Sequence, residues 1–383
     1  MARKFGMGRQ RIVWVDAAKG FAILCIIVGH FSAFFMDYLD FAKILFLATG
    51  SFHVPLFFLL SGYTMNPNKR LGAPAIKKLA KRCFLPYAFA GVISVAMCLL
   101  LVDPSRLYDF VFGFFYGAGA YRDHILFGDT SHVNAIGLIW FLPALFIGKI
   151  LASSMHSLRM KTRAALSALL FLIASETAPV LFLPFDIQQG ICACWWIVCG
   201  MWLKQSKAFV AEGALGTKRL VAAIGAMGTI YIGSVVAGAV GVPMYCNSTY
   251  HAPLLDMLCT SFACISCLLV VKRAVERIYV LERALTWCGL HSIAIFVFHA
   301  ISLSPGDEVK WWIHGLVDGG FQPVAAFVIL LLVNVVLVFG ATVASSRIRP
   351  IRWILYGGKA PEMPPAHARQ GSEATFRYRH AMQ

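Results

Sequence analysis

About ten separate stretches of this 383-residue chain are long and apolar enough to cross a lipid bilayer. Each holds close to the ~20 mostly apolar residues that an α-helix needs to span the hydrocarbon core. A backbone inside a bilayer must satisfy its own hydrogen bonds, and runs of this length do so as helices. The sequence therefore predicts an all-α, polytopic integral membrane protein. The predicted spans cover residues 12–34, 44–64, 83–102, 135–153, 164–182, 187–203, 219–241, 254–271, 286–304 and 323–345.

The composition agrees with a membrane location. Hydrophobic residues make up 59% of the chain and charged residues 14%, whereas a soluble domain carries ~25% charged residues. We expect no cleaved signal peptide, because the first apolar stretch contains charged residues and no small-residue cleavage site follows it. The first predicted helix should therefore remain in the mature protein.

The Lys and Arg residues set the predicted orientation. With the N-terminus in the cytoplasm, all but five of the 34 Lys and Arg residues fall in cytoplasmic segments, as the positive-inside rule expects. Ten spans then return the C-terminus to the cytoplasm. The net charge of +16 follows from this topology and suits anionic lipids, so it requires no nucleic-acid partner. We expect residues 1–345 to form one membrane-embedded domain and residues 346–383 a basic, mobile cytoplasmic tail.

Three ionisable residues lie within the first predicted span, in the stretch DAAKGFAILCIIVGH. At 100° per residue, Asp16, Lys19 and His30 fall on one face of a helix. A charged group at mid-membrane costs ~2.5–3.5 kcal/mol, so this face should line the bundle interior or a water-filled cavity. A purely structural interpretation stays open. In it, Asp16 and Lys19 form an i, i+3 ion pair near the cytoplasmic end and His30 packs as a neutral imidazole.

Two further histidines are predicted at the depth of His30. His53 precedes Pro55 in the second span, in SFHVPLFFLLSGY, and the proline should bend that helix. His299 lies near the outer end of the ninth span. Three histidines from separate helices predict a shared polar pocket, used for proton chemistry or for binding a polar ligand.

Other candidate binding residues lie outside this pocket. The loop and helix start after the second span hold Lys78, Lys81 and Arg82 without an acid, which suits a phosphorylated ligand. The positive-inside rule alone also accounts for these charges. Trp140 is either an interfacial anchor or part of an acceptor site. The long outer loop of residues 103–134, rich in aromatic and polar residues, is of a length that is often functional.

Five motifs occur in an order typical of one family. The chain resembles the acyltransferase 3 family of membrane O-acyltransferases, in particular its fucose 4-O-acetylase-like branch. The likeness covers about residues 11–345. The stretches that carry it are VDAAKGFAILCIIVGH, SFHVPLFFLLSGY, KKLAKRCFLPY, LIWFLPALFIG and CGLHSIAIFVFH.

The resemblance implies transfer of an acyl group, usually acetyl, from cytoplasmic acetyl-CoA to a hydroxyl of a sugar or cell-envelope glycoconjugate. It also implies a bacterial inner or plasma membrane. The family's basic residue and its catalytic histidine fall on Lys19 and His30, and its basic motif, thought to meet the acyl-CoA, falls on Lys78, Lys81 and Arg82. Lys replaces the Arg of many members at Lys19, so this side chain cannot make bidentate contacts.

The chemistry of these residues agrees with acyl transfer. The ordinary pKa of a histidine makes His30 a suitable base for removing a hydroxyl proton. Asp16 would hold Lys19 in place, His53 is a second catalytic candidate, and His299 joins Trp140 as a candidate for binding the acceptor. We expect no metal cofactor, because the cysteines lie in apolar spans without nearby His or carboxylate ligands.

Two other function classes remain open at this stage. A secondary transporter or flippase would also have many spans and buried ionisable groups, although it would be expected to show internal repeats and paired broken helices. A glycosyltransferase using a lipid-linked donor would need an acidic pair in its first outer loop, for which Asp37 and Asp40 are a weak match.

Overall fold

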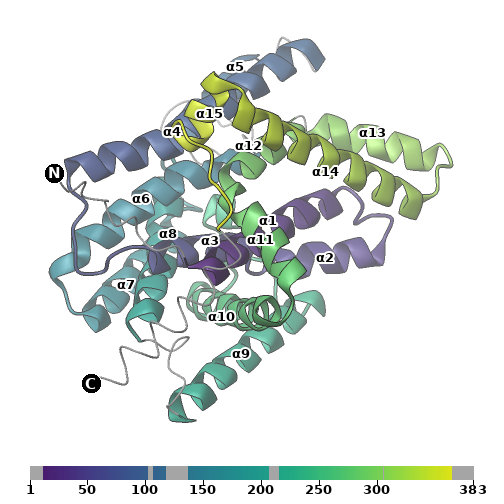
Figure 1. Ribbon diagram of the computed structural model, residues 1–383. Coiled ribbons are helices and arrows are strands. Elements are labelled where there is room, and N and C mark those ends of the chain that lie inside the picture. The colour runs from purple at the N-terminus through teal and green to yellow at the C-terminus, as the bar shows by residue number, and fades with distance from the viewer. Residues whose placement is uncertain (1–11, 102–106, 118–136, 207–214, 305, 365–383) are drawn as a thin grey trace.

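The computed structural model describes residues 12–101, 107–117, 137–206, 215–304 and 306–364 (Figure 1). Over these residues the chain forms α-helices and short 3-10 turns and no β-strand, which confirms the predicted all-α fold. The helices are α1 Val13–Ala33, α2 Asp40–Gly50, α3 His53–Tyr63, α4 Ala73–Leu101, α5 Leu107–Tyr116, α6 Phe141–Ser154, α7 Met160–Thr177, α8 Ile187–Gln205, α9 Leu215–Val236, α10 Pro253–Arg277, α11 Tyr279–Leu290, α12 Ser292–Ser302, α13 Gly306–Asp318, α14 Pro323–Arg347 and α15 Arg349–Tyr356. The 3-10 turns are η3 Gly137–Trp140, η4 Met155–Ser157 and η5 Tyr245–Asn247.

The described residues contain seven helical segments that are long and apolar enough to cross a membrane. One of these segments, Asp40–Tyr63, joins α2 and α3. The count rises to eight if α11 and α12, whose axes meet at 71°, are taken together as one broken span. A multi-pass membrane protein is therefore confirmed, and the exact number of ten spans stays a prediction.

The predicted fifth and sixth spans correspond to α7 and α8, which are helical but less apolar. At the start of α8, Gln188 and Gln189 are buried and hydrogen bonded: their Nε2 atoms donate to Leu181 O and Cys246 O, each at 2.8 Å. The helix packs against α3, α6 and α7. Because protein covers α8 on several sides, its residues need not be apolar throughout.

The central helix α1 packs closely against α11 through glycine (Figure 1). A Cβ atom at Gly20 would lie 1.8 Å from Leu285 O, and one at Gly289 would lie 1.7 Å from Asp16 O. Such small-residue contacts are typical of helix interfaces in membranes. They hold in place the helix that carries Asp16, Lys19 and His30.

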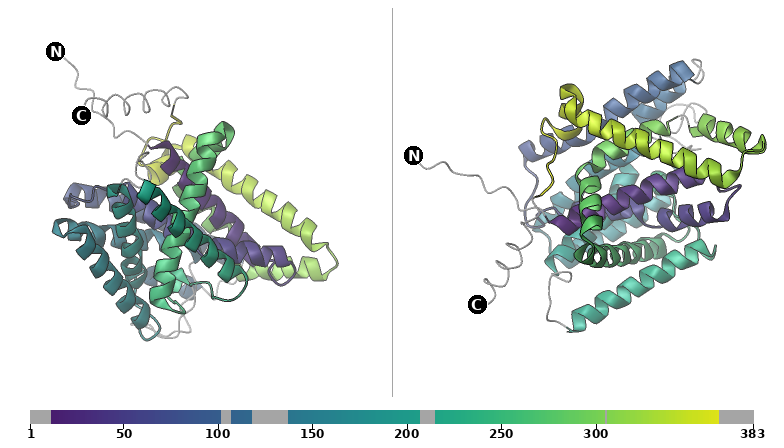
Figure 2. Two further views of the ribbon diagram at one scale, coloured as in Figure 1. Left: turned by 90° about the horizontal axis from the view of Figure 1, so that it is seen from below. Right: turned by 45° about the vertical axis from the view of Figure 1, so that its right-hand side comes forward.

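Polar contacts join α13 to the turn between α1 and α2, on the side of the bundle where α13 and α14 meet (Figure 2). Lys310 Nζ lies 3.5 Å from Asp37 Oδ2, and the Tyr38 hydroxyl donates to Asp318 Oδ1 at 2.9 Å. Asp37 is thus an ion-pair partner, and Asp40 is the first residue of α2. The geometry gives no support to an acidic catalytic pair in this turn.

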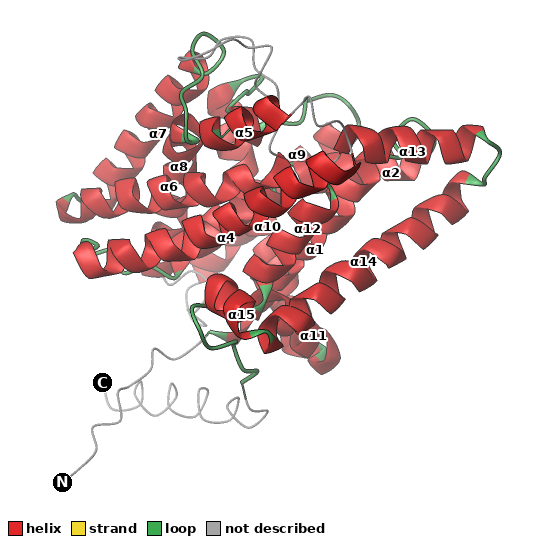
Figure 3. Cartoon of the chain, turned by 90° about the horizontal axis from the view of Figure 1, so that it is seen from above, coloured by secondary structure: helices red, strands yellow, loops and turns green. Residues whose placement is uncertain are grey.

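The predicted tail begins with ordered structure. After α14 ends, residues Arg349–Tyr356 form α15, which packs on α4 and α14 (Figure 3). Ile351, Ile354 and Leu355 recur at helical spacing and pack into the core, so this part is a helix rather than a mobile chain. Residues 365–383, the rest of the predicted tail, lie outside the described residues.

Candidate active site

A cavity of about 860 Å³ lies where several helix ends meet. Its walls come from the N-terminal parts of α1, α4 and α6, the C-terminal parts of α3 and α8, the bend between α11 and α12, and α15 with the residues after it. Ile12 and residues 359–362 line the same opening, so the two described ends of the chain lie on one side of the bundle. These are ends that the sequence predicts to be cytoplasmic.

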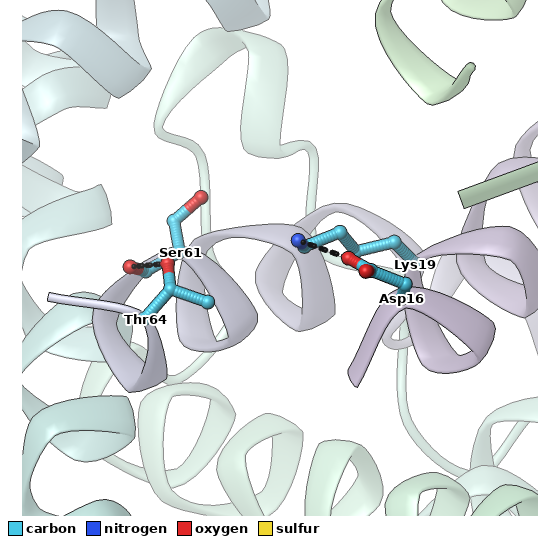
Figure 4. Close-up of polar contacts among 4 residues, drawn as sticks. All are labelled: Asp16, Lys19, Ser61 and Thr64. Atoms are coloured by element: carbon cyan, nitrogen blue, oxygen red, sulfur yellow. Dashed lines mark hydrogen bonds and ion pairs between the residues drawn. The ribbon is translucent and has the colours of Figure 1, made fainter. Parts of the chain in front are cut away.

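Cationic side chains outnumber acidic ones in this cavity. Lys19 Nζ and Asp16 Oδ1 are 3.0 Å apart, which confirms the predicted ion pair; Figure 4 shows it beside Ser61 and Thr64 at the end of α3. Among the described residues, the charged side chains that line the cavity are Lys19, Arg82, Lys149, Lys204 and Lys359 against Asp16 and Glu362.

Lys149 lines the cavity without a hydrogen bond or ion pair to any described residue. It belongs to α6, in a segment apolar enough to cross the membrane. Lys204, by comparison, donates to Met65 O at 2.8 Å. A lysine without an acidic partner at such a position favours an anionic ligand.

The opposite end of the cavity is apolar and leads toward His30. Ile26, Phe57, Phe141 and Phe296 line it. The carbonyl oxygen of Ile26 is hydrogen bonded to Nδ1 of His30 at 2.8 Å, and His30 lies about one helical turn farther along α1. The cavity thus runs from a cationic mouth to within a turn of this histidine.

The three histidines that the sequence predicts to converge do lie together. His30 of α1 is placed between His53 of α3 and His299 of α12. The ring centroids are 5.2 Å apart for His30 and His53 and 6.1 Å apart for His30 and His299. Both partners come from interrupted helices, since α3 starts after a break at Ser51 and α12 follows the bend at His291.

Backbone carbonyls fix the orientation of two of these rings. The Nδ1 atoms of His30 and His53 lie 2.8 Å from Ile26 O and 2.6 Å from Thr49 O. A carbonyl only accepts hydrogen bonds, so each Nδ1 carries the proton. In a neutral imidazole the lone pair then lies on Nε2, the atom that is able to take a proton from a substrate.

His299 is fully buried, and neither of its ring nitrogens makes a hydrogen bond of good geometry with a described residue, although the Asn334 side chain lies beside the ring. A buried N–H without a partner is costly, so this ring is suited to bind a polar group that reaches the cluster. Within the described residues, no group of three or more His, Cys, Asp or Glu side chains is arranged to hold a metal ion. The cluster of His30, His53 and His299 is therefore not a metal site of this kind.

Some predicted site residues lie away from the cavity. Arg82 lines it, but Lys78 and Lys81 are exposed and do not. Trp140 is 5% exposed and packs in the core beside Phe141, so its ring is enclosed by protein rather than facing outward. Most of the long outer loop predicted to be functional, residues 118–136, lies outside the described residues.

Several lining residues gave no distinctive signal in the sequence. Lys149 and Lys204 lie at the ends of predicted spans, where the positive-inside rule already accounts for a lysine. Tyr356 and Lys359 belong to the predicted mobile tail. Only the folded arrangement places these four beside Lys19.

Comparison with known proteins identifies the family. A family model described as an acyltransferase domain, that of the acyltransferase 3 family, matches residues 12–346. No curated protein and no solved structure matches the chain. The match covers every described helix from α1 to α13 and α14 as far as Ser346, together with Lys19, His30, His53 and His299. The chain therefore belongs to the acyltransferase 3 family of membrane acyltransferases.

Proposed function

We propose that this membrane acyltransferase moves an acyl group, in the first instance acetyl, from cytoplasmic acyl-CoA to a hydroxyl of a sugar or cell-envelope glycoconjugate. The observation that carries the proposal is the shape and polarity of the cavity. Its mouth is cationic, its deep end is apolar, and that deep end reaches within a turn of His30.

This polarity suits acyl-CoA. The phosphates of the donor would lie at the mouth, near Lys19, Arg82 and Lys149, because these cations exceed the nearby acids. The uncharged arm of the donor would follow the apolar passage past Phe57 and Phe296. The thioester would then approach the histidine cluster from the predicted cytoplasmic side.

His30 is the proposed general base. Its Nε2 atom takes the proton of the acceptor hydroxyl while the hydroxyl oxygen attacks the thioester carbonyl carbon. The carbon–sulfur bond breaks, and the CoA thiolate leaves with the proton that His30 returns. His53 and His299 lie on either side of His30, where they are placed to hold the acceptor or the developing oxyanion.

The proposed acceptor is a polyhydroxylated molecule that approaches from the other face of the bundle. The histidines lie toward the end of α1 that is predicted to be outside the cytoplasm, whereas the cationic mouth lies at the start of this helix. A donor and an acceptor entering from opposite sides would meet at His30 without a carrier for the acyl group. The membrane we propose is the bacterial inner or plasma membrane, as the family resemblance implies.

A transporter or flippase is the second candidate, and one observation favours it. The bend of 71° between α11 and α12 is the kind of helix break that transporters use at a binding site. The acyltransferase family match outweighs this single broken span.

Release of free CoA from acetyl-CoA by purified protein in lipid vesicles tests the proposal. With a mixture of envelope sugars present, His30→Ala should lower the rate by ~10²–10⁴-fold, the usual contribution of a general base. His30→Gln should lose as much, because its amide cannot take a proton. His251→Ala, an exposed loop histidine, is the matched control. If folded wild-type protein releases no CoA with any acceptor, the result would contradict acyl transfer and favour the transporter interpretation.

A further inference from the structure

The chain beyond the acyltransferase family match contributes to the cavity. The match ends at residue 346, yet six lining residues come from later in the chain. They are Leu355, Tyr356, Lys359, Ala360, Pro361 and Glu362. This chain therefore builds part of its cationic mouth from a segment that the match does not cover.

Two contacts with α11 and its C-terminal end hold this segment against the bundle. The Tyr356 hydroxyl lies 3.0 Å from Nδ1 of His291, at the bend before α12, and the two rings meet edge to face. Arg283 Nη1 donates to Pro364 O at 2.9 Å. Burial raises the pKa of Tyr356, so its hydroxyl keeps its proton near neutral pH. Residues 357–364 are thus fixed at both ends.

The turn that starts this segment depends on glycine. Gly357 and Gly358 have φ of 73° and 110°, a backbone region that side chains with a Cβ rarely adopt. The turn leads from α15 into residues 359–362, which line the cavity. Ile12, from the other described end of the chain, lines that same opening.

The segment also adds charge at the opening. Lys359 Nζ lies 2.9 Å from Glu362 Oε1, and both side chains are mostly exposed. A surface pair of this kind contributes little to stability. A phosphate group at the opening would therefore draw Lys359 away from Glu362 at low cost.

We propose that residues 357–364 recognise the nucleotide end of the acyl donor. The segment would form the outer wall of the donor site, with Lys359 beside the phosphates and Arg283 as the anchor that keeps the segment in place. This inference rests on the proposed function. It predicts a preference for donors that carry the adenosine phosphates over donors that end at the pantetheine arm.

Steady-state kinetics with two donors tests this proposal. Acetyl-CoA carries the nucleotide, and acetyl-pantetheine lacks it. Arg283→Ala and Lys359→Ala should each raise the KM for acetyl-CoA about tenfold, the effect of losing one hydrogen bond to a charged group, with kcat unchanged. Neither variant should alter the kinetics with acetyl-pantetheine. Arg283→Lys, which retains a donor for Pro364 O, should restore most of the affinity.

Arg277→Ala is the matched control, because Arg277 is an exposed arginine at the end of the neighbouring helix α10. An unchanged KM for acetyl-CoA in both variants would overturn the proposal. An equal rise in KM for acetyl-CoA and for acetyl-pantetheine would also overturn it, because it would point to a structural role for the two residues. Titration of CoA into the protein separates the proposed function from the proposed role of residues 357–364. If wild type and both variants bind CoA equally well, only the role of residues 357–364 is rejected. Absence of CoA binding by wild type rejects the proposed function as well.

Discussion

Among the single residues of the site, Lys19 and Lys149 differ in how their charges are balanced. Lys19 is paired with Asp16, whereas Lys149 has no acid or hydrogen-bond acceptor within the described residues. A lysine near the centre of a membrane helix costs ~2.5–3.5 kcal/mol, and less near an end. A side chain that costs stability and faces a cavity is typical of a binding site.

Replacing Lys149 should therefore make the protein more stable and, at the same time, weaken its binding of CoA. We expect Lys149→Met to raise the Tm of the purified protein by a few degrees, because it removes the unpaired charge while keeping a long side chain. The same change should weaken CoA binding about tenfold, through loss of one contact to a phosphate. Differential scanning fluorimetry and CoA titration measure the two effects, with Lys149→Arg as the control that keeps the charge. A lower Tm together with full CoA binding would contradict this assignment.

The sequence predicts which site residues lie together more reliably when they share one helix than when they come from several helices. Asp16, Lys19 and His30 follow from helical spacing alone, and their common face is the one that turns to the cavity and the histidines. The place of Lys149 beside Lys19 depends on how α6 packs against its neighbours, which no local pattern encodes.

Among the helices, the contact between α1 and α11 positions the proposed base. Gly20 and Gly289 let the two backbones touch, and α1 carries His30 two to three turns farther along. The sequence predicts α1 as the first span, residues 12–34, but of α11 it predicts only the last residues, as the start of the ninth span at 286–304. It does not predict the bend between α11 and α12 or the helix α15, because bends and short amphipathic ends depend on tertiary contacts.

Substitution of Gly20 tests the importance of this contact. A Cβ at that position would lie 1.8 Å from Leu285 O, and a backbone oxygen cannot move aside without shifting α11. We expect Gly20→Ala to destabilise the protein by ~1–3 kcal/mol, the usual cost of overpacking, and to reduce acyl transfer by moving His30. Gly233→Ala in α9 is the matched control, since nothing lies within 4 Å of its added Cβ. Equal thermal stability of the two variants would show that α1 tolerates the displacement.

For the whole molecule, the placement of α7 and α8 decides the number of membrane spans. α7 has charged residues within it, and α8 begins with two glutamines, so neither matches the composition of a lipid-facing span. α8 nevertheless packs along α3 and α6, which belong to segments that do match, and α7 packs along α8 and contacts α10. Counting α7 and α8 as spans, and the broken pair of α11 and α12 as one, gives the predicted ten, an even number that leaves both ends in the cytoplasm.

Reporter insertions would decide this topology. A reporter active only in the cytoplasm should work after Arg159, before α7, and should fail after Pro179, between α7 and α8. It should work again after Ser206, because α8 would return the chain to the side where its end lines the cationic cavity with Lys204. A reporter after Tyr38 supplies the external reference. Activity after both Arg159 and Pro179 would instead leave α7 and α8 on the cytoplasmic side, and the buried glutamines of α8 would then face protein in a cytoplasmic layer.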